Sequence, residues 1–97
     1  MFKVFSVPPA ERSRKEAVLN DDVVSRQSIA EREADALGFR GLGILVLVEG
    51  DERAVARAAE LFKGIGEDLP TEKAAAIRKR IREQDDDAAS GVGLIFR

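Results

Sequence analysis

The chain has 97 residues, 35% of them charged, and its 16 basic and 18 acidic residues leave a formal net charge of −2. It contains no His, Cys, Trp or Tyr. Without Cys there are no disulfides, thiolate nucleophiles or sulfur-ligated metals, and without His there are no imidazole ligands and no Ser-His or Cys-His triads. Hydrophobic residues make up 44%, but a third of them are alanine, so we expect a single domain, 1–97, with a thin core.

The ends and the apolar runs of the chain indicate its compartment. Met1–Ala10 fits neither a signal peptide nor a lipid-attachment signal. The longest apolar run, Ile44–Val48, is far shorter than the ~20 residues that span a bilayer. We therefore expect a soluble, cytoplasmic protein that makes no membrane contact. Abundant Arg and Glu with few Asn, Gln and Met favour a thermophilic source, and a GC-rich genome explains the same usage equally well.

The first third of the chain predicts a strand and then a helix. Residues 2–7 (FKVFSV) are aromatic and β-branched, which is typical of a strand. Pro8 and Pro9 suit the first turn of a helix, which we expect over 10–19. Asn20, Asp21 and Asp22 predict a turn, after which Val23 and Val24 either close a short strand or pack against the core.

The middle of the chain predicts a second helix and a buried strand. Ser28 and Glu31 have the spacing of a capping box, and Gly38 suits the left-handed residue that ends a helix, so we expect a helix over 28–37. The run 44–48 (ILVLV) is apolar on both faces, which predicts a central strand covered on both sides.

The last part predicts two helices and a final strand. Asp51 is a suitable N-cap for an amphipathic helix that ends at Gly64 or Gly66. Thr71 begins a further helix, with Ala74, Ile77 and Ile81 on one face. The three aspartates 85–87 are expected to interrupt that helix as a solvated linker, and residues 91–97 (GVGLIFR) are expected to form the last strand.

This order of elements predicts an α/β or α+β fold, with three to four helices and a small three- to four-stranded sheet that is mixed or partly parallel. A ferredoxin-like sandwich is the nearest plan. It needs a fourth strand, which only Val18–Val24 could supply. The strand-turn-helix unit over 45–62 is common in small α/β domains and identifies no family.

Two glycine motifs, 38–43 (GFRGLG) and 64–66 (GIG), raise the possibility of phosphate binding. A dinucleotide fingerprint follows a strand and opens a helix, whereas both of these motifs follow a predicted helix. We therefore favour a structural role for these glycines at helix ends and loops.

Four carboxylates are weak candidates for ligand binding. Glu49, Asp51 and Glu52 follow the apolar strand at its carboxyl end, where oxygen ligands could hold Mg²⁺ or Ca²⁺. A structural role is favoured, because Asp51 suffices as an N-cap and acidic residues stabilise a first helical turn. Glu33 falls on the apolar face of the predicted helix 28–37, where it is solvated at the margin, paired with an arginine across an interface, or desolvated with a raised pKa; the solvated state is favoured.

The basic residues do not point to nucleic acid. Arg78, Lys79, Arg80 and Arg82 spread around the predicted helix, and the net charge is negative. We expect no nucleic-acid partner, and we assign no catalytic residue, metal ligand or cofactor.

The composition favours a noncatalytic interaction or regulatory module that self-associates. A thin core cannot cover every face and edge of a sheet, and a two-fold homodimer that extends the sheet or stacks its open face would solve this. A protein partner is a further expectation. The alternative function is a divalent-cation or small-ligand domain using Glu33, Glu49, Asp51 and Glu52. An enzyme that uses only carboxylates and arginines stays open.

Overall fold

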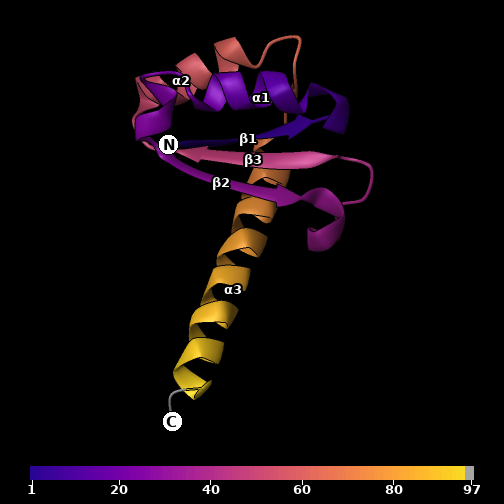
Figure 1. The fold of residues 1–97 in the computed structure, drawn as a ribbon, viewed down its shortest axis with the longest axis vertical. Coiled ribbons are helices and arrows are strands. Elements are labelled where there is room, and N and C mark those ends of the chain that lie inside the picture. Colours follow the sequence, from indigo (N-terminus) through magenta and orange to yellow (C-terminus); the bar gives the residue numbers. More distant parts are fainter. Residues whose placement is uncertain (96–97) are drawn as a thin grey trace.

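The predicted buried strand lies at the centre of a four-stranded antiparallel sheet. The computed structural model describes residues 1–95, with side chains described up to residue 85. The strands are β1 (Phe2–Val7), β2 (Ser28–Glu33), β3 (Ile44–Glu49) and the short β4 (Glu67–Asp68). Their order in the sheet is β2-β3-β1-β4, so β3 has a neighbour on both sides (Figure 1). The predictions of strands at 2–7 and 44–48 are confirmed.

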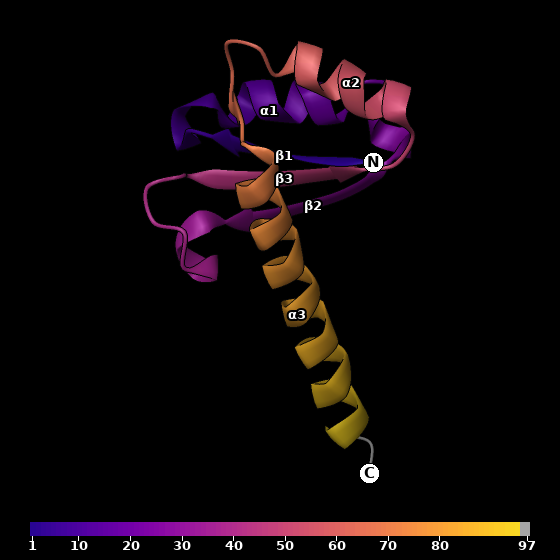
Figure 2. The ribbon, with the colours of Figure 1, turned by 180° about the vertical axis from the view of Figure 1, so that it is seen from behind.

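Helices cover both faces of this sheet, and the described residues form a small α+β fold. The helical elements are η1 (Pro9–Glu11), α1 (Arg12–Leu19), η2 (Val24–Arg26), η3 (Ala34–Leu37), α2 (Glu52–Leu61) and α3 (Thr71–Ile95). Helices α1 and α2 lie on one face, and α3 crosses the other (Figures 1 and 2).

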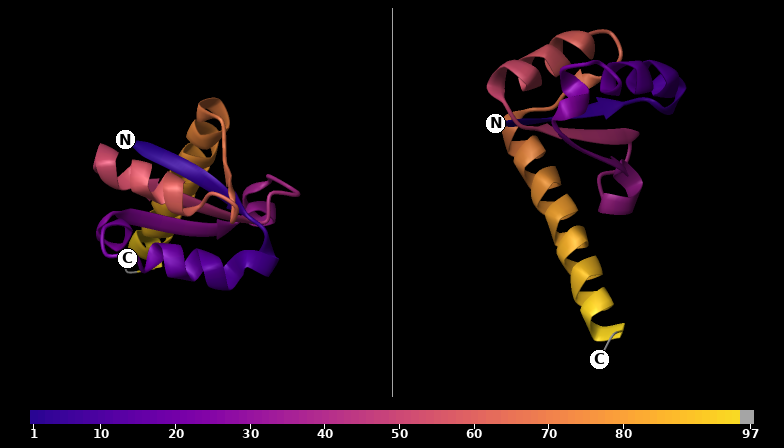
Figure 3. Two further views of the ribbon diagram at one scale, coloured as in Figure 1. Left: turned by 90° about the horizontal axis from the view of Figure 1, so that it is seen from above. Right: turned by 60° about the vertical axis from the view of Figure 1, so that its left-hand side comes forward.

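Helix α3 determines the elongated outline of the molecule. At 25 residues it is about 37 Å long, whereas the longest extent of the whole molecule is 47 Å. Its first turns lie against the sheet and its later turns extend away from the sheet, as the right-hand view of Figure 3 shows. Within the part of the chain that the structure describes, no helix is long and apolar enough to cross a membrane.

Every strand pair is antiparallel, so the expected mixed or partly parallel sheet is wrong. Helix α1 connects β1 to β2, and α2 connects β3 to β4. These are two strand-helix-strand units. In the sheet, β3 lies between β1 and β2 of the first unit, and β1 lies between β3 and β4 of the second. From the sequence, helical connections between strands predict a partly parallel sheet. In the structure the two strand-helix-strand units interlock, which places strands of opposite direction side by side.

The core on the α1/α2 side of the sheet combines strand and helix residues. Phe5 of β1 stacks on Phe62, which follows α2, with ring centroids 4.5 Å apart. The buried members of this core are Phe5, Val7, Val18, Leu19, Val24, Ile44, Val46, Val48, Val55, Ala58 and Phe62. Since α2 contributes Val55 and Ala58 to it, the predicted amphipathic helix is confirmed.

A second core lies on the α3 side. It consists of Val4, Ala34, Leu37, Leu45, Leu47, Leu69, Ala74, Ile77 and Ile81. The three predicted apolar positions of the last helix are thus confirmed as buried. Alternate residues of β3 enter the two cores, which is why this strand is apolar on both faces.

The helix predicted over 28–37 is wrong, because residues 28–33 form β2 and residues 34–37 form η3. Ile29 packs toward the α1/α2 core and Ala30 toward the α3 core, as alternation in a strand requires. A capping box is a local preference, whereas β3 needs a hydrogen-bonded neighbour on this side. Gly38, with φ of 86°, does end η3 in the left-handed conformation.

Two further strand predictions are wrong. Residues 18–24 end α1 and begin η2, with Val18 and Val24 packed in the core. Residues 91–95 belong to α3, which continues through 85–87; residues 96 and 97 of the predicted last strand lie outside the described residues. The ferredoxin-like plan drawn from the sequence is therefore not confirmed, because two of its four strands are misplaced and α3 adds a third layer.

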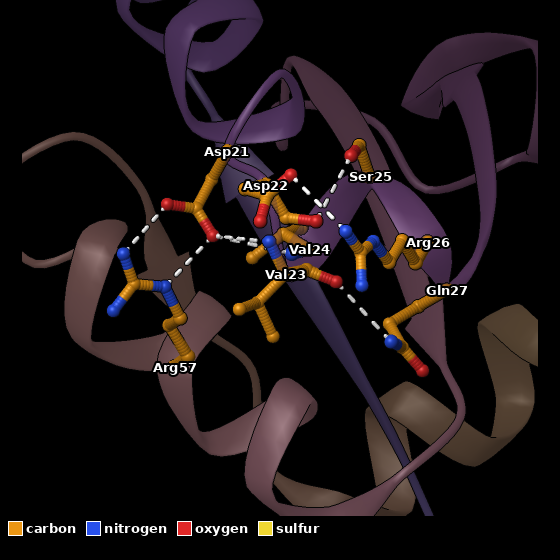
Figure 4. A network of polar contacts seen from close by, with 8 residues as sticks. All are labelled: Asp21, Asp22, Val23, Val24, Ser25, Arg26, Gln27 and Arg57. Carbon is orange, nitrogen blue, oxygen red and sulfur yellow. Dashed lines mark hydrogen bonds and ion pairs between the residues drawn. The ribbon is translucent and has the colours of Figure 1, made fainter.

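A carboxylate connects the turn after α1 to α2 (Figure 4). Asp21 accepts hydrogen bonds from Nε and Nη2 of Arg57 at 2.7 Å each. It also accepts from the backbone N–H groups of Val23 and Val24 at 3.1 and 3.2 Å. These contacts, the Arg57 hydrogen bonds above all, hold the pKa of Asp21 below its usual range although partial burial opposes the shift. The predicted turn therefore also fixes α1 against α2.

The third layer can be tested through Ile77, which is fully buried between α3 and the sheet. We expect Ile77→Ala to lower the free energy of unfolding by about 2–4 kcal/mol, because it leaves a cavity under α3. Ala76→Ser, on the exposed side of the same turn, should change it by less than about 0.5 kcal/mol. Chemical denaturation measures both variants, and equal stabilities would show that α3 does not pack on the sheet.

Candidate functional site

The four carboxylates predicted as ligand-binding residues do not form one cluster. Glu33 is paired with Ile44 at the start of β3, whereas Glu49 ends the same strand. Five residue steps along a strand separate the two positions by about 17 Å. Glu33 is exposed at the end of β2 and not on a helix face.

Glu49 is bound by two arginines of α3. Its carboxylate accepts from Nε of Arg78 at 3.0 Å and from Nη2 of Arg82 at 3.3 Å. The Arg78 guanidinium also lies over the Phe2 ring, 4.6 Å from its centroid. Hydrogen bonds from Arg78 lower the pKa of Glu49, and the charges of both arginines add to this, while partial burial opposes it. Glu49 thus fixes α3 to the end of the central strand.

Asp51 is the N-cap of α2, and Glu52 is the first residue of that helix. The Asp51 carboxylate accepts from the N–H of Arg53 at 3.2 Å, which confirms the predicted N-cap. The Asp51 N–H in turn donates to Oε1 of Gln27 at 3.1 Å. Glu52 is exposed. In the part of the chain that the structure describes, no group of three acidic side chains is placed to hold a metal ion.

The two glycine motifs meet at a surface cleft of about 550 Å³ beside the end of β1. The lining residues are Ser6, Pro8, Pro9, Gly41, Leu42, Gly43, Gly64, Ile65, Gly66 and Glu67. A Cβ on Gly43 would lie 2.6 Å from the Val7 carbonyl oxygen, and one on Gly66 would lie 3.0 Å from the Ser6 carbonyl oxygen. Close approach of the backbones to β1 therefore explains these two glycines, as the structural interpretation predicted.

Lys15 is a buried cation that the sequence analysis missed. It is 5% exposed, and its Nζ donates to Glu31 of β2 and forms an ion pair with Glu16 at 3.1 Å. Burial by itself lowers the pKa of Lys15, but the hydrogen bonds to Glu31 and Glu16 outweigh it, so the net pKa is raised. The only signal in the sequence is one lysine on a highly charged helix, which does not distinguish it from Arg12 or Arg14.

The outer edge of β2 carries backbone groups that point away from the sheet. The Ala34 N–H donates to the Gly43 carbonyl at 2.8 Å, which sets the alternation along this strand pair. In an antiparallel ladder every second residue faces the neighbouring strand, so the N–H and C=O groups of Ile29, Glu31 and Glu33 face outward. We call these three residues the outer row of β2. Within the described residues, no strand pairs with this row.

Arg32 covers the middle of the outer row. Its Nη1 donates to the outward carbonyl of Glu31 at 2.7 Å. Its Nη2 donates to Oδ1 of Asp85 on α3 at 3.0 Å. The guanidinium thus connects the edge of the sheet to α3, and the sequence offered no sign of this because Arg32 and Asp85 are 53 positions apart.

The close approach at Gly43 generates a prediction with a matched control. Gly43 and Gly41 both have positive φ, 71° and 83°, but a Cβ on Gly41 meets nothing within 4 Å. We expect Gly41→Ala to cost about 1–2 kcal/mol of stability for the left-handed backbone. Gly43→Ala should cost a further ~1–3 kcal/mol for the clash with β1. Thermal or chemical unfolding measures the difference, and equal costs would contradict the close approach.

The lowered pKa of Glu49 predicts a pH-dependent contribution to stability. A carboxylate with a depressed pKa in the fold stabilises it above its unfolded pKa, and this contribution is lost as the pH falls through the folded value. Glu49→Gln should therefore cost about 1–2 kcal/mol near pH 7 and progressively less as the pH falls below about 4. Unfolding measured across this range tests the sign, with the exposed Glu67→Gln as control. A cost that stays constant with pH would contradict the ion pair.

Comparisons of the chain with known protein families, with curated proteins and with solved structures find no match. No known protein therefore indicates the function of this chain. The features that bear on function are the contacts of the described residues: the outer row of β2, the arginine that covers it, and the ion pairs at the margins of the sheet.

Proposed function

We propose that this chain is a small noncatalytic interaction module that self-associates by pairing β2 with β2 of a second copy. The outer row of β2 carries the proposal. An edge strand presents unpaired N–H and C=O groups, which form a template for another strand. β2 is six residues long and contains no proline or bulge that would interrupt such pairing.

The properties of β4 and of the sheet face under α3 favour β2 as the contact between two copies. β4 has only two residues, so it offers a short template. Stacking of an open sheet face, the second arrangement considered from the sequence, is disfavoured because α3 occupies that face through Ala74, Ile77 and Ile81. Sheet extension at β2 is the arrangement of the homodimer that fits both observations.

The expected strength of such a dimer is modest. Antiparallel pairing of two six-residue strands forms about six backbone hydrogen bonds, each contributing about 0.5–1.5 kcal/mol. Association costs roughly 4–15 kcal/mol in lost translational and rotational freedom. Side-chain contacts must supply the remainder, so we expect a dissociation constant of about 1–100 µM.

The contacts of the other candidate residues favour this function over the cation-binding alternative. Glu49 is held by Arg78 and Arg82, and Asp51 caps α2. A cation would have to displace the arginines from Glu49 and the backbone N–H from Asp51. Self-association at β2 requires only that Arg32 leave the Glu31 carbonyl, and the contacts of Glu49 and Asp51 stay in place.

Substitutions of Glu33 distinguish the contribution of its backbone N–H to self-association from that of its side chain. Its φ of −73° suits proline, and its N–H belongs to the outer row, so Glu33→Pro should leave the ladder to β3 intact. It removes one intermolecular N–H donor per copy and should weaken self-association about tenfold or more. Glu33→Ala removes the carboxylate and keeps the N–H, and should associate like the parent chain.

Analytical ultracentrifugation over a concentration series measures these dissociation constants, with circular dichroism to verify the fold of each variant. A parent chain that stays monomeric to several hundred micromolar would refute self-association. If Glu33→Pro leaves the dimer dissociation constant unchanged, the interface lies elsewhere than β2.

A further inference from the structure

Arg32 donates to the Glu31 carbonyl, which is the central acceptor in a symmetric pairing of two β2 strands. A two-fold axis at Glu31 places Glu31 opposite its own copy and Ile29 opposite Glu33 of the second copy. All three residues of the outer row are then paired, whereas a shift by two residues leaves at least one unpaired. In this register the Glu31 carbonyl accepts from the Glu31 N–H of the second copy.

The same carbonyl accepts from Nη1 of Arg32, while Nη2 of Arg32 is held by Asp85. The Glu31 N–H of a second copy would therefore compete with the charged Arg32 guanidinium for the same acceptor. We propose that Arg32 is a releasable guard of the β2 edge, and that two copies pair about Glu31 when Arg32 leaves the Glu31 carbonyl. This inference rests on the proposed self-association through β2.

Asp85 makes the guard depend on α3. The Arg32 side chain is one-third exposed, and its Nη2 donates to Asp85 of α3. When α3 lies on the sheet, Asp85 keeps Arg32 in place and the edge is covered. Any change that moves this turn of α3, or neutralises Asp85, releases the guanidinium and opens the edge.

The charges at the centre of the register are compatible with pairing. Two Glu31 carboxylates would lie opposite each other, on the face of the sheet that α1 covers. Each carboxylate is already bound by Lys15 of its own copy, so two lysines balance the two acidic groups. A cross-strand pair of unneutralised carboxylates would otherwise disfavour this register.

Release of the guard is tested with Arg32→Ala, Asp85→Asn and a matched control. Arg32→Ala removes the guard and should lower the dimer dissociation constant about tenfold. Asp85→Asn keeps Arg32 but weakens the contact that holds its guanidinium at α3. This variant should lower the dimer dissociation constant about threefold. Glu83→Gln is the control, because Glu83 lies on the same helix and pairs with Arg80; it should leave the constant unchanged.

The register is tested by disulfide trapping, since the chain has no cysteine of its own. Residues opposite each other in a hydrogen-bonded antiparallel pair have Cα atoms about 5.5 Å apart, which suits a disulfide. Glu31→Cys should therefore form a covalent dimer under mild oxidation. Glu33→Cys, which faces Ile29 of the second copy, should form little, and combining Glu31→Cys with Arg32→Ala should increase trapping.

The outcomes separate this inference from the proposed function. If the parent chain and Glu33→Pro behave as expected but Arg32→Ala and Asp85→Asn bind no more tightly, self-association stands and the guard is overturned. If Glu33→Cys is trapped in place of Glu31→Cys, the register is overturned. If the parent is monomeric while Arg32→Ala forms a dimer trapped at Glu31→Cys, the guard is supported and unaided self-association is refuted.

Discussion

The structure depends on one constraint, which is that β3 is apolar on both faces and must be buried on every side. A strand of this kind needs hydrogen-bonded neighbours at both edges and a covering layer on each face. β1 and β2 supply the neighbours, α1 and α2 supply one layer, and α3 with η3 supplies the other. The small number of large apolar residues is therefore arranged as two thin cores that share β3.

Charged side chains fix the margins of this sheet, where the thin cores end. Lys15 connects α1 to β2, Glu49 connects β3 to α3, and Arg32 connects β2 to α3. Each contact joins a helix to a strand that is distant in sequence. The pairs of Lys15 and Glu49 are only partly accessible to water, so they are screened less than ordinary surface pairs and help to hold α1 and α3 on the sheet.

With four strands in the sheet, β2 forms one edge and the two-residue β4 forms the other. Natural edge strands are commonly protected by charged side chains that discourage pairing with other chains. In β2 the Arg32 guanidinium contacts an outward carbonyl, and its second contact lies on α3. A guard held by an exposed ion pair is weak, since such pairs contribute little in water. In the arrangement that we propose, release of Arg32 would therefore control pairing with a second copy.

Local patterns in the sequence determined those elements whose preference and environment agree. The strands at 2–7 and 44–48, the helix that Asp51 caps, and the burial of Ile77 could all be predicted, because alternation, periodicity and capping are properties of neighbouring residues. Tertiary structure alone decided that 28–33 is a strand, since β3 required a neighbour and outweighed the capping box. It also decided the partners of Lys15, Glu49 and Arg32, because the pairing of charges far apart in sequence is set by strand order, which no local pattern encodes.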